Sequence, residues 1–247
     1  MQARANLKIV SGGEPCAGPG AGRCANCGAR ALSVFAQVSD AGLSRMEALS
    51  EEVELRPGEI LAREGDAAAH VFNITGGAVR VYKLMADGRR QIIGFLFAGD
   101  FLGLTSDKDY AFSAEALEPV TACRFNRKGY MGVVEQFPEL ESALLSRFTS
   151  DLSAAQAHML LLVRKTARER VASFLLDLSA RAARRGADAD SVHLVMTRGE
   201  IADYLGLTLE TVSRTLSALK SKGAIRQTDS RTYTILARRQ LEAMSGA

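Results

Sequence analysis

Apolar residues change their spacing along this chain, and the changes mark different kinds of structure. Between residues 53 and 127, short apolar or alternating runs are separated by turn signals such as Arg56-Pro57-Gly58 and Asp87-Gly88. Runs of this length predict strands, and their regular spacing favours a small antiparallel barrel or jelly roll. Asp87-Gly88 is the strongest hairpin signal. A short helix is predicted over 40–49, capped by Ser39 or Asp40, and strands over 71–74, 79–82, 91–96 and 120–125.

A longer helical pattern begins near Pro138, where apolar residues alternate spacings of three and four. This heptad seam favours a two-helix coiled coil, which a chain with one such helix forms with a second copy of itself. A core helix lying on the barrel is the alternative. The expected dimerisation residues are Leu145, Phe148, Leu152, Ala155, Met159 and Leu162. A separate helix around 171–178 follows and ends in a polar linker over 181–190.

The last part of the chain has the pattern of a helix-turn-helix unit. Thr197 begins a capping box, the helix over 200–205 stops at Gly206, and Thr208 caps a second helix. Two short strands, 225–226 and 232–236, predict a winged hairpin.

The second helix of this unit carries polar residues in its first two turns, where a recognition helix faces base edges. Arginine can bond guanine in a bidentate manner, a carboxylate can accept from cytosine, and a hydroxyl can serve either base. A surface ion pair between Glu210 and Arg214 is the alternative for those two residues. The expected DNA-contacting residues are Thr208, Glu210, Thr211, Ser213 and Arg214.

Composition and charge agree with a globular DNA-binding protein. The chain has 247 residues, 47% of them hydrophobic, which is ample for a core. Residues 165–247 carry 14 basic and nine acidic side chains, whereas residues 1–164 have a net charge of −2. A basic C-terminal part favours an anionic partner. No stretch approaches the ~18 apolar residues that span a bilayer, and no signal sequence is present, so we expect a cytoplasmic protein without a membrane partner.

Three of the four cysteines lie in a glycine-rich segment, 11–29, that cannot build its own core. Cys24 and Cys27 form a C-x2-C pair, Cys16 lies eight residues upstream, and Cys123 lies in a predicted strand. Four cysteines are too few for a disulfide scaffold. Four thiolates can hold a [4Fe–4S] cluster or a tetrahedral zinc ion, and spacing alone does not choose between them. The same residues would also fit a thiol/disulfide switch, or no site at all.

Four stretches of the chain carry a family resemblance. They are Gly58-Glu-Ile-Leu-Ala-Arg-Glu-Gly-Asp66, Gly76-Gly-Ala-Val-Arg-Val-Tyr82, Ile93-Gly-Phe-Leu-Phe-Ala-Gly-Asp100 and Thr197-Arg-Gly-Glu-Ile-Ala-Asp-Tyr-Leu-Gly-Leu-Thr-Leu-Glu-Thr-Val-Ser-Arg214. From about residue 32 to 240 the chain resembles the CRP/FNR family of bacterial transcription regulators, most closely its FNR branch. The resemblance implies an α+β chain with a cyclic-nucleotide-binding-like jelly-roll barrel, a long dimerisation helix and a C-terminal winged helix-turn-helix.

The run Glu210-Thr-Val-Ser-Arg214 is similar to the E-x-x-S-R recognition motif of FNR-type proteins. That similarity implies a homodimer on palindromic double-stranded DNA resembling TTGAT-N4-ATCAA, with RNA polymerase as a further partner. Members of the cyclic-nucleotide branch hold the phosphate with an Arg-Ser/Thr pair, whereas loop 107–113 has two aspartates and no arginine. We therefore expect no cyclic nucleotide.

In FNR-like oxygen sensors, three N-terminal cysteines and one barrel cysteine hold an oxygen-labile [4Fe–4S] cluster. The resemblance therefore implies Cys16, Cys24, Cys27 and Cys123 as ligands of such a cluster. In the best-known pattern, a third cysteine follows the C-x2-C pair by six residues. In this chain that position is Ser33, so Cys16 must serve as the third N-terminal ligand instead.

Two different modes of control on the same fold stay open. One is a FixK-like regulator without a cluster, controlled by thiol redox or by its own expression. The other is a haem or small-molecule sensor with His70 as the only barrel ligand candidate. We expect no enzyme, because the three histidines have no local catalytic partner and no P-loop is present. The expected domains are a cluster-binding segment (1–33), a barrel (34–137), a dimerisation helix (138–164) and a winged helix-turn-helix domain (165–247).

Overall fold

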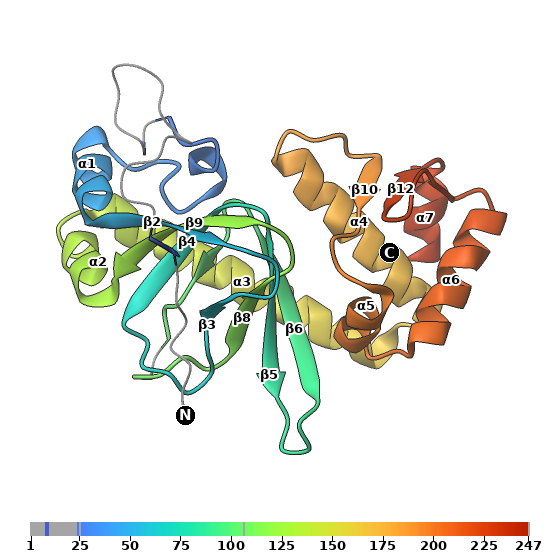
Figure 1. Cartoon of the computed structure of the whole chain (residues 1–247). Helices are drawn as coiled ribbons and strands as arrows, with labels where there is room; N and C mark the ends of the chain where they lie inside the picture. Colours follow the sequence, from blue (N-terminus) through green and yellow to red (C-terminus); the bar gives the residue numbers. More distant parts are fainter. Residues whose placement is uncertain (1–7, 10–23, 25, 106, 247) are drawn as a thin grey trace. The chain divides into compact units, whose positions relative to one another are not determined.

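The computed structural model describes residues 8–9, 24, 26–105 and 107–246. It divides into two compact units, Met1–Ser150 and Asp151–Ala247, with the division inside the long helix α3, Pro138–Arg164 (Figure 1). Among the described residues, no helix has the length and apolar character needed to cross a membrane.

Two antiparallel sheets form the barrel of the first unit. The strand order is β1-β2-β9-β4-β7 in one sheet and β3-β8-β5-β6 in the other. The strands are β1 Lys8–Ile9, β2 Ser50–Leu55, β3 Ile60–Ala62, β4 His70–Gly76, β5 Ala78–Leu84, β6 Arg90–Phe97, β7 Phe101–Leu102, β8 Ser113–Ala116 and β9 Val120–Asn126. The helices are the 3-10 turn η1 Arg30–Leu32, α1 Asp40–Leu49, α2 Arg127–Val134 and α3.

The predicted elements of this unit are confirmed, and others are added. Each of the four predicted strands lies inside an observed strand, and the hairpin joining β5 to β6 turns at Gly88 with φ of 82°. Ser39 caps α1, with its side chain accepting from the Gly42 amide. Among the described residues of this unit, the sequence patterns missed β1, β2, β3, β7, β8, η1 and α2.

The two faces of the five-stranded sheet pack into different apolar clusters. On β9, Ala122 belongs to the cluster inside the barrel, and Phe125 to a second cluster on the outer face of the sheet. This outer cluster joins the chain around Val34 and Phe35 to α1, α2 and the first turns of α3. Cys123 packs against the same outer cluster.

The second unit contains the predicted winged helix-turn-helix. Its elements are α4 Ala167–Arg184, β10 Ser191–His193, α5 Arg198–Leu205, α6 Leu209–Ser221, β11 Ile225–Gln227, β12 Thr232–Ile235 and α7 Arg238–Met244. Thr197 and Glu200 form the predicted capping box, and Gly206 ends α5 in the left-handed conformation. The wing has a third strand, β10, beside β12, and α4 extends four residues into the predicted linker.

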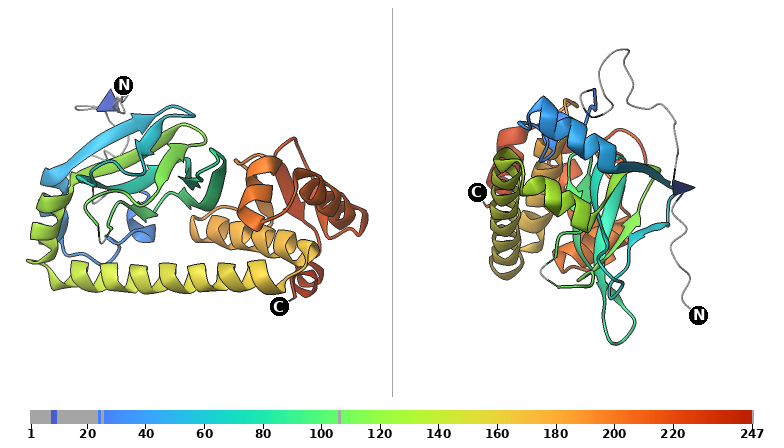
Figure 2. Two further views of the ribbon diagram at one scale, coloured as in Figure 1. Left: turned by 90° about the horizontal axis from the view of Figure 1, so that it is seen from below. Right: turned by 90° about the vertical axis from the view of Figure 1, so that its left-hand side faces the viewer.

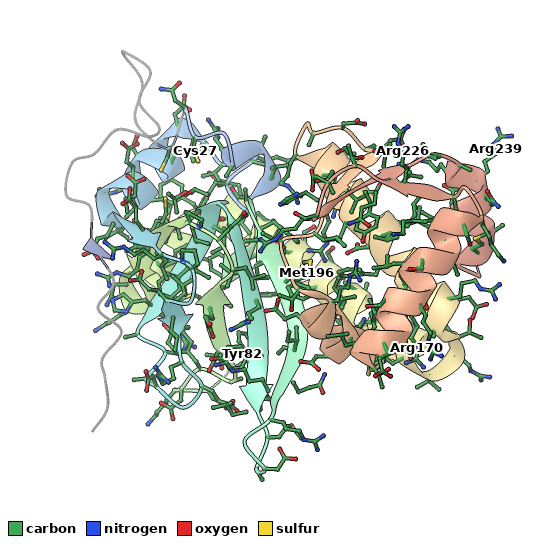
Figure 3. The ribbon with its side chains drawn as sticks, turned by 45° about the vertical axis from the view of Figure 1, so that its right-hand side comes forward. Cys27, Tyr82, Arg170, Met196, Arg226 and Arg239 are labelled. Atoms are coloured by element: carbon green, nitrogen blue, oxygen red, sulfur yellow. The ribbon has the colours of Figure 1, made fainter. Side chains whose placement is uncertain are left out.

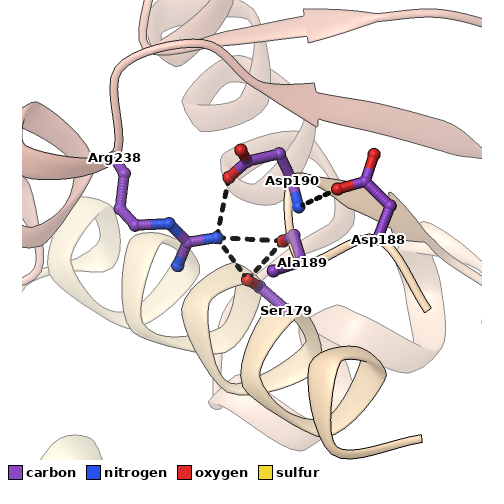
Figure 4. Close-up of polar contacts among 5 residues, drawn as sticks. All are labelled: Ser179, Asp188, Ala189, Asp190 and Arg238. Carbon is purple, nitrogen blue, oxygen red and sulfur yellow. Dashed lines mark hydrogen bonds and ion pairs between the residues drawn. The ribbon is translucent and has the colours of Figure 1, made fainter. Parts of the chain in front are cut away.

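A polar network fixes the loop between α4 and the wing (Figure 4). One nitrogen of Arg238, at the start of α7, donates to Ser179 Oγ, the Ala189 carbonyl and Asp190 Oδ1 at 2.8, 2.9 and 2.8 Å. Ser179 is fully buried and donates to the same Ala189 carbonyl at 2.6 Å. The arginine thereby ties α7 to the loop that leads into β10.

Candidate functional site

Helix α6 has one buried face and one polar, exposed face. Val212, Leu216 and Leu219 are buried, whereas Glu210 and Arg214 are exposed. The remaining three candidates, Thr208, Thr211 and Ser213, carry hydroxyl groups. Thr208 Oγ1 accepts from the Thr211 amide at 3.2 Å and lies 2.9 Å from Thr211 Oγ1, and Ser213 is half-buried. Glu210 and Arg214 are therefore presented outward together, as a recognition helix requires.

Arg198 is a further polar residue beside α6 that the sequence patterns did not single out. It lies in the first turn of α5 and donates from Nη1 to Ser213 Oγ at 3.3 Å. The two exposed arginines Arg226, on β11, and Arg239, on α7, add positive charge to this unit (Figure 3). A cation next to the first turns of α6 suits a partner with a phosphate backbone.

Arg170, on α4, connects the end of α3 to the turn of the helix-turn-helix (Figure 3). Its guanidinium donates to the carbonyls of Leu162 and Lys165 at 2.7 and 2.9 Å. It also donates to the carbonyls of Leu205 and Gly206 at 2.9 and 3.3 Å. One side chain thus satisfies carbonyls at the C-terminal ends of two helices, which have no partner within their own helix.

The expected dimerisation residues lie on one continuous helix, α3 (Figure 2), and most of their side chains are exposed. Leu145, Phe148, Leu152 and Met159 are 67%, 44%, 59% and 58% exposed. Ala155 is also exposed, and Leu162 is half-buried. A row of exposed large apolar side chains is typical of a protein–protein contact. Only the first turns of α3, through Leu140 and Leu144, are buried in the core of the first unit.

Three of the four candidate metal ligands line one cavity on the outer face of the five-stranded sheet. Cys24, Cys27 and Cys123 are half-buried cysteines in its wall, none of them in a disulfide, and Cys16 lies outside the described residues. Figure 3 labels Cys27. The other lining residues are Arg30, Ser33, Phe35, Ser50, Glu52, Asn73, Thr75 and Phe125. Within the described ranges, no three His, Cys, Asp or Glu side chains already converge closely enough to hold a metal ion.

Hydrogen bonds within the cysteine segment and to α1, together with one close contact to the barrel, position this segment. The Cys24 amide donates to Glu47 Oε2 on α1 at 3.3 Å, and the Arg30 amide donates to the Cys27 carbonyl at 2.9 Å. Leu32 packs against Gly99, which has φ of 93° and where a Cβ would collide with Leu32. The turn after β6 therefore needs glycine both for its backbone conformation and for this close approach.

Ser33 lies in the wall of the same cavity. It is 8% exposed, donates from Oγ to the Arg30 carbonyl at 2.9 Å and accepts from the Phe35 amide at 3.2 Å. The position where the FNR pattern has a cysteine thus borders the cavity that Cys24, Cys27 and Cys123 line.

His70, the alternative haem ligand, is half-buried on β4. Burial lowers its pKa, and the Arg124 guanidinium lowers it further. Its ring lies 6.4 Å from that of Phe72, and it is not among the residues that line the cysteine cavity.

Known proteins resemble this chain over most of its length. A Crp-like helix-turn-helix domain matches residues 169–244, and a cyclic nucleotide-binding domain matches residues 52–137. The nitrogen fixation regulation protein FixK of Bradyrhizobium diazoefficiens is 41% identical over 202 residues, covering 82% of this chain and 85% of FixK. The transcriptional activatory protein AadR of Rhodopseudomonas palustris is 41% identical over 204 residues, with coverage of 82% and 85%.

The solved structure of FixK2 from Bradyrhizobium japonicum has a TM-score of 0.75 and 38% identity, covering 80% of this chain and 98% of FixK2. These relatives are regulators, which is consistent with the expectation that the chain is not an enzyme. Sequence, fold and relatives agree that the chain belongs to the CRP/FNR family of transcription regulators and carries a helix-turn-helix DNA-binding domain.

Proposed function

We propose that this regulator responds to oxygen through a [4Fe–4S] cluster held by Cys16, Cys24, Cys27 and Cys123. One observation carries the proposal. Cysteines from two distant parts of the chain, the C-x2-C segment and strand β9, line one cavity. A cysteine on a strand is by itself an ordinary small apolar residue, but the presence of a C-x2-C pair in the wall of the same cavity supports a shared ligand set.

The cavity suits a sulfur-bound cluster. Thiolates are the ligands of [4Fe–4S] clusters, and Cys16 would complete the set of four. When bound, the cluster supplies an oxygen-reactive centre. Cys24 and Cys27 would then hold the N-terminal segment, and Cys123 would hold β9, so that loss of the cluster removes a link between segment and barrel.

A packed route leads from this cavity to α3. Phe35 and Phe125 have ring centroids 5.9 Å apart, and Phe125 lies 5.5 Å from the buried Tyr130 of α2. The same apolar cluster contains Leu140 of α3. Ser39 also donates to Glu139 of α3 at 2.6 Å. Movement of the cysteine segment would thus shift packing at the first turns of α3, which supports control of dimerisation.

The dimer would use the exposed row on α3 and bind palindromic DNA resembling TTGAT-N4-ATCAA, because two recognition helices must lie one DNA turn apart. Arg214, Glu210 and Ser213 would contact base edges, and RNA polymerase is the further partner we expect.

A matched pair of substitutions on α3 tests the dimer. Leu152→Glu places a charge in the exposed row and should yield monomers that no longer bind the palindrome. Ser150→Glu is the control, because two residues are about 200° apart around a helix. Sedimentation and operator binding measure both. If Leu152→Glu still forms dimers that bind the palindrome as the original chain does, this row of α3 is not the dimer interface.

A second pair tests the ligands. Cys123→Ser should remove most of the iron and acid-labile sulfide from protein purified without oxygen. Thr75→Val, in the wall of the same cavity, should retain both, because the Thr75 hydroxyl is engaged by Thr121 at 2.9 Å. Equal iron and sulfide in the two variants would remove Cys123 from the ligand set.

The second candidate is a regulator without a cluster, controlled by thiol redox or by its own expression. Its support is the 41% identity to FixK. If this candidate is right, the protein binds its operator equally well with and without iron. If thiol redox controls it, operator binding depends on reductant alone.

A further inference from the structure

Asn73 is a buried polar residue on the wall of the cysteine cavity. In the sheet register, Cys123 of β9 lies directly opposite Asn73 of β4 on one side and Glu52 of β2 on the other. Directly opposite residues of antiparallel strands point to the same face, so the three side chains form a row across the outer face of the sheet. All three line the cavity.

The burial of Asn73 is not explained by packing. The residue is 2% exposed, and its Oδ1 is buried with no hydrogen-bond partner among the described residues. Val71 precedes it on the same face of β4 and is fully buried, so an apolar side chain fits this surface. A buried carboxamide with an unpaired end is less stable than an apolar group of the same shape. The observation points to a partner that enters the cavity.

We propose that Asn73 is a positioning residue for the sulfur centre of this cavity, and that its carboxamide donates a hydrogen bond to Cys123 Sγ or to an adjacent cluster sulfide. This inference rests on the proposed cluster. Thiolate and sulfide sulfurs accept hydrogen bonds and do not donate them, so they cannot pair with Oδ1 as it stands. A half-turn about the Cβ–Cγ bond exchanges the two ends of the carboxamide and would bring its NH2 group to the sulfur. The hydroxyls of Thr75 and Ser33 on the same wall are engaged by Thr121 and by the Arg30 carbonyl.

The bond would set how readily oxygen attacks the cluster. Hydrogen bonds to sulfur stabilise the electron-rich state of an iron–sulfur cluster. If dioxygen took one electron from such a cluster and became superoxide, the hydrogen bond from Asn73 would make that loss less favourable. Asn73 would thus slow the response to oxygen, independently of DNA binding.

The test compares air sensitivity with folding stability in the full chain. Asn73→Leu keeps the approximate size and removes both donors, and Asn73→Asp keeps the shape and also removes them. Each variant, purified without oxygen, should lose its visible absorbance near 420 nm in air about tenfold faster than the original chain. Thr75→Val is the control and should bleach at the original rate.

Urea unfolding of the cluster-free proteins separates this role from a structural one. Asn73→Leu should be as stable as the original chain or more stable, because it removes an unpaired polar group. Bleaching of both Asn73 variants at the original rate, or equal acceleration by Thr75→Val, would overturn the role of Asn73 and leave the cluster in place. An original chain purified without oxygen that contains neither iron nor sulfide would overturn the proposed cluster, and this inference with it.

Discussion

Replacing Arg170 by methionine should uncouple the end of α3 from the turn of the helix-turn-helix. Methionine keeps an apolar stem and removes the guanidinium, which donates to the carbonyls of Leu162, Lys165 and Leu205 at 2.7, 2.9 and 2.9 Å. A hydrogen bond from a charged donor contributes about 1.5–3 kcal/mol, and we take ~1 kcal/mol for each because water can reach these partly buried carbonyls. The fourth bond, to Gly206, is exposed and 3.3 Å long, so it adds little to the stability. The expected loss of stability is about 3 kcal/mol.

Urea unfolding of the full chain, followed by circular dichroism, measures this loss. Operator affinity should fall as well, because the turn that positions α6 loses its support, while dimerisation through α3 should persist. Arg168→Met is the matched control, since Arg168 is an exposed arginine two residues earlier on α4 and its removal changes the net charge equally. Arg170→Met and Arg168→Met with equal stability and equal operator affinity would refute the role assigned to Arg170.

Three further predictions concern DNA reading, pH and the third N-terminal ligand. Arg214→Ala should weaken operator binding by ~1–3 kcal/mol and relax guanine preference at one position, whereas uniform weakening on all sequences would refute base reading. Burial lowers the pKa of His158, which stacks on Tyr204 at 4.2 Å. Stability should therefore be retained above about pH 6.5 and fall as the pH drops below it, and His158→Phe should reduce that fall in urea titrations, because it keeps the stack and does not titrate. Cys16→Ser should lose iron and sulfide, and adding Ser33→Cys should restore them because Ser33 borders the same cavity. Failure of Cys16→Ser to lose them would exclude Cys16 as a ligand.

The elements that the sequence patterns identified are those whose local residues determine them. β4, β5, β6 and β9 contain β-branched and aromatic runs, and α3 contains a heptad. The missed β8, Ser113–Ala116, is buried throughout, yet it consists of Ser, Ala and Glu, which are not typical strand residues. The carboxylate of Glu115 is buried there because Arg80 and Arg90 pair with it at 2.5 and 3.4 Å. These partners come from other strands, so no local pattern indicates them.

The candidate site shows the same division between local and long-range information. The spacing of Cys24 and Cys27 is a local signal, and so are the residues of α6. The presence of Cys123 in the same cavity depends on the register of β9 and on the packing of Leu32 against Gly99. Asn73 has no local signal at all, because only its register with Cys123 and its burial single it out.

The proposed oxygen-responsive cluster is tested by counting iron and acid-labile sulfide in protein purified without oxygen, then admitting air and following the same sample. We expect about four iron and four sulfide per chain. We also expect the visible absorbance, the dimer and operator binding to be lost together in air. A colourless dimer that binds its operator equally well before and after air would contradict the cluster, while leaving the DNA-binding domain and its family intact.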